Sequence, residues 1–212
     1  MQDDSGLKKI LTLSWAYILF KRALGSRRAL NWMSREFWQV QPGQKVVDIG
    51  CGPGIVLPFL RGDIDYVGFD VSDEYIRHAR EVHAGQPRRT FLVGRSEDFI
   101  EHLPSAMANA DLVLINGVLH HLDDGEATTA LRLARACLAP GGRLVSYENC
   151  LLRSQAPMAR WIVNQDRGRN LRYESEWKLL FSHVFRDFDT HILTGLLRIP
   201  YTHIVVEARR DT

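Results

Sequence analysis

The sequence predicts an α/β fold in which a parallel sheet is covered by helices on both faces. Short apolar runs alternate with stretches of helical periodicity over residues 45–147, and such alternation implies right-handed crossovers between parallel strands. Glycine and proline residues mark turns between these segments. Of the 212 residues, 45% are hydrophobic and 25% are charged, as in ordinary globular domains. These values predict one compact domain and exclude a collagen-like fibre, a coiled coil or a disordered tail.

Seven strands are expected, each as a short apolar run that follows a turn. Five lie in the alternating part, and the last two form a closing pair: residues 45–49, 66–70, 91–93, 111–116, 143–147, 190–194 and 202–208. Residues 151–172 fall outside the alternating pattern, which is where an elaboration of a common core is expected.

Helices are expected between these strands. One begins within residues 55–60, a second runs over 72–84 with Ser72 as its N-cap, and a third starts at Asp123 or Asp124 and ends at Pro140. Two more are expected at 157–165 and 174–185.

The N-terminal part predicts a helical cover over residues 1–40. Its longest apolar run, residues 10–20, is shorter than the roughly 20 residues needed to span a bilayer. Lys21 and Arg22 follow this run directly, where a signal peptide would have a cleavage site. We therefore expect a cytoplasmic protein. A broad apolar stripe flanked by basic residues leaves weak contact with an anionic membrane surface as the alternative.

Charge and cysteine content exclude further classes. The formal net charge of +2 is too small for nucleic-acid binding through bulk charge. Cys51, Cys137 and Cys150 are odd in number and lack CxxC spacing. This favours a reducing compartment and argues against a disulfide scaffold or a structural metal site.

A glycine loop after the first strand carries the first chemical signal. Gly50, Gly52 and Gly54 alternate there, so the backbone can approach a ligand closely, with amides and a helix N-terminus available to it. Asp70 ends the second strand, where nucleoside-binding folds place an acid for ribose hydroxyls. A tight turn and a helix N-cap are the structural alternatives. Ile55 occupies the third glycine position of a dinucleotide fingerprint, and no Walker-type lysine follows.

Four motifs in order resemble those of one enzyme family. VVDIGCGPG, VGFDVS, DLVLINGVLHHLDD and LAPGGRLV, within residues 45–150, are similar to motifs of the small-molecule branch of class I S-adenosylmethionine-dependent methyltransferases. The resemblance implies a doubly wound, Rossmann-like seven-stranded sheet with a C-terminal antiparallel hairpin. It also implies S-adenosylmethionine as cofactor and methyl transfer to a small-molecule acceptor, with O-methylation favoured.

The resemblance assigns roles to residues at the ends of the first four strands. Asp48 and the loop from Gly50 to Gly54, including Cys51 and Gly52, would flank the amino-acid part of the cofactor. The ribose, the adenine and the wall of the pocket would be contacted by Asp70, Val71, Ser96, Glu97, Asn116, Val118 and Leu119. Arg95 replaces an acid that is usual in the family, which weakens the assignment of Glu97.

Candidate catalytic residues follow the fourth and fifth strands. An oxygen acceptor must lose a proton, and His120 or His121 could serve as the base or orient the acceptor. Glu148 and Asn149, at the end of the fifth strand, lie on the same rim. The alternative is that the histidines hydrogen-bond the loop backbone and shape the cofactor pocket, while Glu148 and Asn149 cap the following segment.

The region after residue 150 predicts an acceptor-side lid. Five arginines lie between residues 153 and 172, against one acid, and guanidinium groups bind carboxylate and phosphate in bidentate fashion. Arg167 and Arg172 are therefore candidates for an anionic or lipid-like acceptor, and a solvated basic face is the alternative. Tyr17, from the N-terminal cover, and Tyr201 are further acceptor-side candidates, although core packing is the commoner role of an aromatic side chain.

The predicted subdivision is an N-terminal cover (1–40), a cofactor-binding core (41–150), a lid (151–173) and a closing helix with a strand pair (174–212). Two other functions stay open. An NAD-dependent oxidoreductase would share the fold, and a non-catalytic module would bind the cofactor without turnover. An RNA methyltransferase is a further alternative, but residues 115–118 do not form the catalytic NPPY-type loop of such enzymes.

Overall fold

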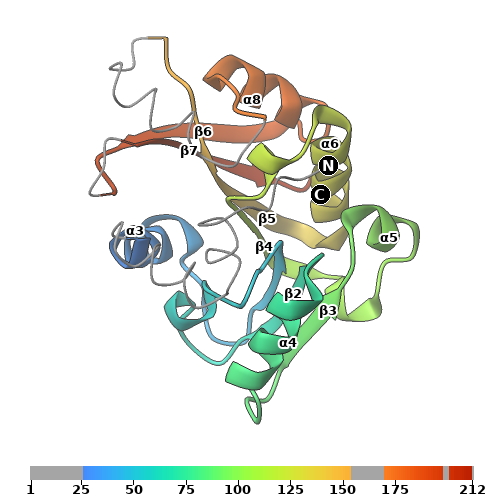
Figure 1. Ribbon diagram of the computed structural model, residues 1–212. Coiled ribbons are helices and arrows are strands. Elements are labelled where there is room, and N and C mark those ends of the chain that lie inside the picture. The colour runs from blue at the N-terminus through green and yellow to red at the C-terminus, as the bar shows by residue number, and fades with distance from the viewer. Residues whose placement is uncertain (1–25, 154–169, 198–200, 212) are drawn as a thin grey trace, which may run out of the picture.

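The computed structural model describes residues 26–153, 170–197 and 201–211. They form one seven-stranded sheet with the order β3-β2-β1-β4-β5-β7-β6 (Figure 1). Strands β1 to β5 run parallel, whereas β7 is antiparallel to both β5 and β6. The predicted fold class, including the C-terminal antiparallel hairpin, is confirmed.

All seven strands were expected, and most of their bounds agree within two residues. They are β1 (Lys45–Ile49), β2 (Asp65–Asp70), β3 (Arg89–Val93), β4 (Ala110–Asn116), β5 (Leu138–Asn149), β6 (Asp187–Thr194) and β7 (Thr202–Arg209). Strand β5 begins five residues earlier than predicted, at Leu138, because Ala110 pairs with Leu138 across a register shift before the regular ladder resumes at Arg143.

Helices cover both faces of the sheet. The α-helices are α3 (Ser26–Met33), α4 (Asp73–Val82), α5 (Ser96–Glu101), α6 (Asp124–Cys137) and α8 (Glu174–Ser182). Short 3-10 turns are η2 (Leu57–Phe59), η3 (Ser105–Met107) and η4 (Leu119–His121), and η1 (Ser34–Trp38) is a π-helical turn. Figure 1 shows α5, α6 and α8 on one side of the sheet and α3 and α4 on the other.

Two apolar layers hold these helices to the sheet. One layer lies under α6 and α8 and includes Leu131, Trp177 and Phe181, which are buried with alternate residues of the strands. The other lies under α3 and α4 and includes Met33 and Ile76. Adjacent residues of a strand face opposite layers, so the runs of buried residues in β1 and β4 reflect burial on both faces.

The predicted N-cap of one helix and the predicted start of another are confirmed. Ser72 accepts a hydrogen bond from the backbone of Tyr75 at 3.3 Å, and this bond caps α4. Asp123 and Glu126 form a reciprocal capping box at the start of α6, with hydrogen bonds of 2.9 and 3.2 Å. These caps fix the points at which the chain leaves β2 and η4.

The α-helix expected after the glycine loop does not form, so this prediction was wrong. Only the 3-10 turn η2 forms there, and the chain is extended again at Leu60. Pro58 lies in this turn and has no N–H to donate, and Gly54 just before it has a φ of 76°. The loop therefore has no α-helix N-terminus behind it. Helix α5 was not expected, because its six residues bury none of their side chains completely.

The predicted helix at 157–165 and the apolar run at 10–20 lie outside the described residues. Of the predicted N-terminal cover, residues 26–38 are described and are helical. None of the described helices is both long enough and apolar enough to cross a membrane.

Candidate active site

The candidate site lies at the carboxyl edge of the sheet, where the loops after β1, β2, β4 and β5 meet. The register pairs Ile49 of β1 with Phe69 and Ile115 on its two sides, so the loops that follow begin at the same level. The amide of Gly117 then donates to the carbonyl of Tyr147 at 2.8 Å, which ties the loop after β4 to β5. In open α/β sheets this edge is where ligands bind.

The glycine loop is held by hydrogen bonds to the end of β2. The amides of Gly50 and Cys51 both donate to the carbonyl of Phe69 at 2.9 Å. A Cβ atom on Gly50, where φ is 70°, would lie 2.4 Å from Val118 Cγ2. Glycine at this position therefore allows the loops after β1 and β4 to touch, as expected if both belong to one site.

Asp70 closes this loop from the neighbouring strand. Its Oδ2 accepts the amide of Gly52 at 3.0 Å, and its Oδ1 accepts the amide of Ser72 at 2.9 Å. Burial raises the pKa of Asp70, and the hydrogen bonds from Ser72, Gly52 and Val71 act against that rise. Each carboxylate oxygen has two acceptor positions, so Asp70 can still accept hydrogen bonds from a diol.

Asp48 lies beneath the loop and belongs to a buried polar cluster with Tyr66 and Cys51. The Tyr66 hydroxyl donates to Asp48 Oδ2 at 2.7 Å. Burial raises the pKa of Asp48 to about 7, the Tyr66 hydrogen bond lowers it, and the charge of Asp70 raises it. Burial also raises the pKa of the Cys51 thiol. A cation above the loop would therefore be attracted to a carboxylate that is otherwise only partly ionised at neutral pH.

Asn116 ends β4 at this edge, and its side-chain amide lacks hydrogen-bond partners in the free protein. Both Oδ1 and Nδ2 of its amide are buried, and neither has a hydrogen-bond partner. An unsatisfied buried polar group costs about 1–3 kcal/mol. Val71, by contrast, is an apolar side chain that is 65% exposed directly after Asp70. An orphaned amide and an uncovered apolar side chain fit a ligand that has both polar and flat apolar parts.

Two other predicted cofactor residues lie after β3. Ser96 is the first residue of α5 and Glu97 is the second. Glu97 lies 3.5 Å from the guanidinium of Arg95, and both side chains are largely exposed. Glu97 is therefore held by a surface ion pair, and its predicted role at an adenine edge stays a prediction.

His120 and Glu148 form a buried pair on the other side of the edge. His120 Nδ1 lies 2.6 Å from Glu148 Oε2, and both side chains are buried. Glu148 Oε1 also accepts the amides of Val118 and Leu119, at 3.1 and 3.0 Å. Glu148 therefore caps the turn η4 and orients the imidazole at the same time. With Nδ1 engaged, Nε2 is the nitrogen left for a proton transfer.

His121 lies next to this pair. Its ring centroid is 4.1 Å from that of His120, with the planes tilted by 42°, and the His121 side chain is exposed. The two histidines therefore differ in their surroundings. His120 is fixed by Glu148, and His121 covers one side of the His120 ring. Which of them reaches an acceptor stays a prediction.

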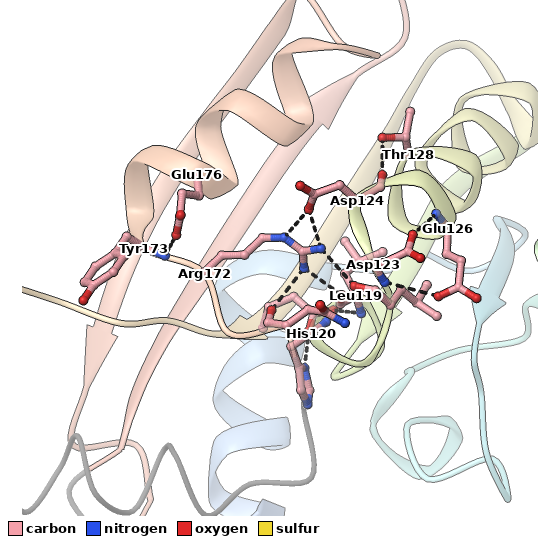
Figure 2. A network of polar contacts seen from close by, with 12 residues as sticks. Leu119, His120, Asp123, Asp124, Glu126, Thr128, Arg172, Tyr173 and Glu176 are labelled. Atoms are coloured by element: carbon pink, nitrogen blue, oxygen red, sulfur yellow. Dashed lines mark hydrogen bonds and ion pairs between the residues drawn. The ribbon is translucent and has the colours of Figure 1, made fainter.

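Arg172 has a role that the sequence did not indicate. Its Nε and Nη2 donate to Asp124 Oδ1, at 3.0 and 2.7 Å. The other donors reach the carbonyls of Leu119, Asn170 and Leu122, at 2.9 to 3.2 Å. Figure 2 shows how the side chain crosses from the segment before α8 to the start of α6. All five N–H groups are therefore occupied, and the guanidinium as placed has no donor for an anionic acceptor.

The remaining acceptor-side candidates are only partly described. Tyr17 and Arg167 lie outside the described residues. Tyr201 is buried, and its ring lies 4.9 Å from that of His203, which in turn stacks at 4.6 Å on Tyr147. These rings sit at the ends of β5 and β7. Sequence reasoning missed Tyr147, whose hydroxyl is buried without a hydrogen-bond partner. The available signal was its position at the end of the predicted fifth strand, directly before the candidates Glu148 and Asn149.

Asn149 packs at the far side of this edge. Its carbonyl accepts the indole N–H of Trp177 at 3.1 Å, which ties the end of β5 to α8. No cluster of three or more metal-ligating side chains occurs within the ranges that the structure describes. The described part of the edge thus offers carboxylates, amides, imidazoles and the hydroxyl of Tyr147 as its chemical groups.

Comparison with known proteins finds methyltransferases among the similar sequences. A family model described as a methyltransferase domain matches residues 47–144. An uncharacterized methyltransferase of Synechocystis is 28% identical over 133 residues, which are 60% of this chain and 59% of the relative. An uncharacterized methyltransferase of Mycobacterium bovis is 33% identical over 134 residues, 59% of this chain and 64% of the relative. The chain therefore spans less than two thirds of either relative.

Solved structures share the fold at low sequence identity. The phosphoethanolamine N-methyltransferase 2 of Haemonchus contortus, in complex with S-adenosylhomocysteine, superposes with a TM-score of 0.73 at 14% identity, covering 97% of this chain and 59% of that one. The pyocyanin biosynthetic protein PhzM superposes with a TM-score of 0.72 at 22% identity, covering 98% and 62%. At these identities the likeness supports the fold alone.

Proposed function

We propose that this chain, whose residues 47–144 match a model of a methyltransferase domain, is a class I S-adenosylmethionine-dependent methyltransferase. We further propose that it methylates a small-molecule acceptor at an oxygen atom. The observation that carries the choice of oxygen is the buried pair of His120 and Glu148, 2.6 Å apart at the edge of the sheet. A hydroxyl acceptor must give up a proton as the new bond forms, and an oriented imidazole is the usual group that receives it.

The cofactor would be held between the loops after β1, β2 and β4. When bound, S-adenosylmethionine supplies an electrophilic methyl group on a positively charged sulfur. Asp70 would accept the ribose hydroxyls, and the orphaned amide of Asn116 would hydrogen-bond the polar end of the ligand. Asp48 would offset the positive charge from beneath the loop. Gly50, Gly52 and Gly54 would let the backbone approach closely.

On the acceptor side, His120 would take up the proton at Nε2. Glu148 fixes the other nitrogen and would stabilise the imidazolium that forms, as the third member of a catalytic triad does. The same carboxylate holds the amides of Val118 and Leu119, so the turn that carries His120 cannot drift from the cofactor loop. Arg172 supports this turn from behind through the carbonyl of Leu119.

The acceptor is proposed to be a small molecule and not a nucleic acid, because the net charge is only +2. An anionic acceptor would depend on Arg167 or on other basic residues of the predicted lid, since Arg172 has its donors occupied. An acceptor with a neutral hydroxyl fits the described edge without them.

The test has two steps. S-adenosylmethionine and NADH are titrated into the full chain by calorimetry, and the Asp70→Ala variant is expected to bind S-adenosylmethionine at least about tenfold more weakly. Tighter binding of NADH would replace the proposal with an oxidoreductase. A cell extract is then incubated with enzyme and isotopically labelled cofactor, and mass spectrometry identifies the metabolite that gains the label.

With that acceptor, His120→Gln is expected to lower kcat by about 10²–10⁴-fold while leaving cofactor affinity within about twofold. Methylation at nitrogen or carbon, or kcat unchanged in His120→Gln, would overturn the assignment of His120 as base. Cofactor binding without transfer to any metabolite would favour the non-catalytic module.

A further inference from the structure

A cavity lies behind the glycine loop, away from the edge described above. It has a volume of about 330 Å³ and lies between the C-terminal end of α4 and the first part of β3. Two guanidinium groups and one imidazole line it, together with neutral side chains, and the lining contains no acid: Arg80, His83, Ala84, Gly85, Gln86, Arg89, Thr90 and Phe91. This volume accommodates a small molecule of several heavy atoms.

Two polar atoms of this lining are buried and have no hydrogen-bond partner. They are Nδ1 of His83 and Nε of Arg89. A buried guanidinium N–H without an acceptor is costly, since hydrogen bonds to charged groups are among the strongest in proteins. Both orphaned atoms belong to side chains that line the same cavity, so one ligand with acceptor oxygens could satisfy them together.

The two arginines are anchored in a way that leaves donors for such a ligand. Arg80 donates through Nη2 to the carbonyl of Phe91 at 2.6 Å, and Arg89 donates through Nη1 to the carbonyls of Ile64 and Arg88. No acidic partner of either guanidinium is found within the described ranges. The anchors fix the positions of the two charges, and a fixed pair of positive charges suits a dianion.

His83 connects this cavity to the cofactor loop. Its ring stacks on Phe91, with centroids 5.7 Å apart, and the ring edge that carries Nε2 faces Gly54. A Cβ atom on Gly54 would lie 3.1 Å from His83 Nε2, so the imidazole packs directly against the last glycine of the loop. Burial lowers the pKa of His83. A side-chain hydrogen bond with Gln86 raises this pKa, and the charges of Arg89 and His78 lower it further.

We propose that this cavity binds a phosphate group, either free or as a small phosphate monoester, and that its occupation strengthens cofactor binding through the contact of His83 with Gly54. Arg80 and Arg89 supply the charge, and His83 Nδ1 donates to a phosphate oxygen. A ligand that fixes the imidazole also fixes the glycine beside it. Only the coupling to the cofactor rests on the function proposed above.

The larger cavity of the described chain does not share these features. It measures about 530 Å³ and lies where α6 and α8 end, beside Arg135, His183 and Arg210. Arg135 pairs with Asp211 at 3.4 Å, and Arg210 donates to the carbonyl of Leu138. The lining of this larger cavity also includes the Asp211 carboxylate, which would repel an anion, whereas the lining of the smaller cavity contains no acid.

Binding is tested by calorimetric titration of the full chain with sodium phosphate, with glycerol 3-phosphate, and with sodium acetate at matched ionic strength. Saturable one-to-one binding of phosphate is expected, with acetate at least about tenfold weaker because it carries a single charge. Binding of the monoester alone would identify an organic phosphate as the source. Heat that does not saturate with either phosphate would overturn the site.

The variant Arg80→Met is expected to weaken phosphate binding by at least about tenfold, because it removes one of the two charges. Arg77→Met is the matched control, since Arg77 is exposed on the same helix and does not line the cavity. An equal loss in both variants would reduce the effect to general surface charge. Circular dichroism spectra of both variants establish that the fold is retained.

The coupling is tested by titrating S-adenosylmethionine with and without saturating phosphate. Phosphate is expected to lower the Kd at least about threefold, and the cofactor must lower the Kd of phosphate by the same factor. His83→Phe keeps the ring stack on Phe91 and is expected to abolish the coupling. Equal Kd values in the wild type would overturn the coupling. If no cofactor binds in either condition, the proposed function fails, and the phosphate titration alone decides the site.

Discussion

Tyr66 donates its hydroxyl hydrogen bond to Asp48 beneath the glycine loop, at a point where both side chains are buried. The bond favours the ionised carboxylate, but burial outweighs it and raises the pKa of Asp48 to about 7 from an ordinary value of 3.8. The free protein therefore holds a carboxylate whose ionisation opposes folding. That cost is understandable if the charge serves a cationic ligand.

The first prediction concerns the stability of the free protein. Between about pH 4 and pH 7 the folded state binds more protons at Asp48 than the unfolded state, so the free energy of unfolding falls as the pH rises through this window. Asp48→Asn keeps the acceptor for Tyr66 and removes the ionisation. We expect its Tm to exceed that of the wild type at pH 8, with the difference shrinking or reversing at pH 5.

Thermal unfolding followed by circular dichroism at both pH values measures this difference. Asp63→Asn, which changes an exposed carboxylate, is the control and should leave the pH profile of Tm unchanged. A wild-type Tm that does not fall relative to Asp48→Asn between pH 5 and pH 8 would contradict a raised pKa at Asp48.

The second prediction concerns the pH dependence of cofactor affinity. Burial raises the pKa of both Asp48 and Asp70, and a bound cation favours their ionised forms. Binding of S-adenosylmethionine near neutral pH should therefore release protons, and its Kd should increase as the pH falls below about 7. Calorimetry in two buffers of different ionisation enthalpy counts the released protons.

The comparison of variants assigns the effect. Asp48→Asn should bind the cofactor more weakly at pH 8 and should show a flatter dependence of Kd on pH. Proton release that is as large in Asp48→Asn as in the wild type would attribute the effect to Asp70 or to another group.

Much of the fold could be predicted because it depends on patterns that are local in the sequence. The apolar run at 45–49 matches β1 residue for residue, the cap at Ser72 is where its side chain indicated, and α6 starts where Asp123 and Asp124 indicated. The helix expected after Gly54 failed because backbone geometry at Gly54 and Pro58 outweighed the apolar pattern. The early start of β5 depends on a pairing of Leu138 with Ala110, which the local sequence does not reveal.

The site was predictable to the extent that strand ends position it. His120 and Glu148 were expected on the same rim, but their contact joins residues 28 positions apart, and the sequence does not encode it locally. Arg172 illustrates the limit more clearly. A run of basic residues indicated a charged surface, whereas tertiary packing turned this arginine inward onto three carbonyls and Asp124.

The third prediction tests that structural role of Arg172. Lysine retains the charge but cannot bridge Asp124 and three carbonyls at once, so Arg172→Lys should lower the free energy of unfolding by about 2–4 kcal/mol. The ion pair itself contributes little, because the Asp124 side chain is 85% exposed. Urea unfolding measures the change, and Arg132→Lys, at an exposed position of α6, should stay within about 0.5 kcal/mol of the wild type. A loss confined to acceptor KM, with stability unchanged, would restore the anion-binding role.

The last prediction concerns Gly68, in the middle of β2, where φ is not positive and the need is for space. A Cβ atom there would lie 2.8 Å from Cys51 Sγ, 2.9 Å from Cys51 Cβ and 2.9 Å from the Tyr66 hydroxyl. Gly68→Ala should therefore destabilise the fold by about 1–3 kcal/mol, as overpacking of a core does. Because the pressure falls on Cys51, it should also loosen the glycine loop and weaken S-adenosylmethionine binding.

Cys51→Gly should recover part of both losses, since it removes two of the three close contacts. Urea unfolding and cofactor titration of the two single variants and the double variant give a coupling energy, expected at about 0.5–3 kcal/mol. Additive losses would mean that Gly68 is needed for the Tyr66 hydroxyl and not for the loop. In that case the double variant Gly68→Ala, Tyr66→Phe should recover stability. Cofactor affinity should then change only in variants that carry Cys51→Gly.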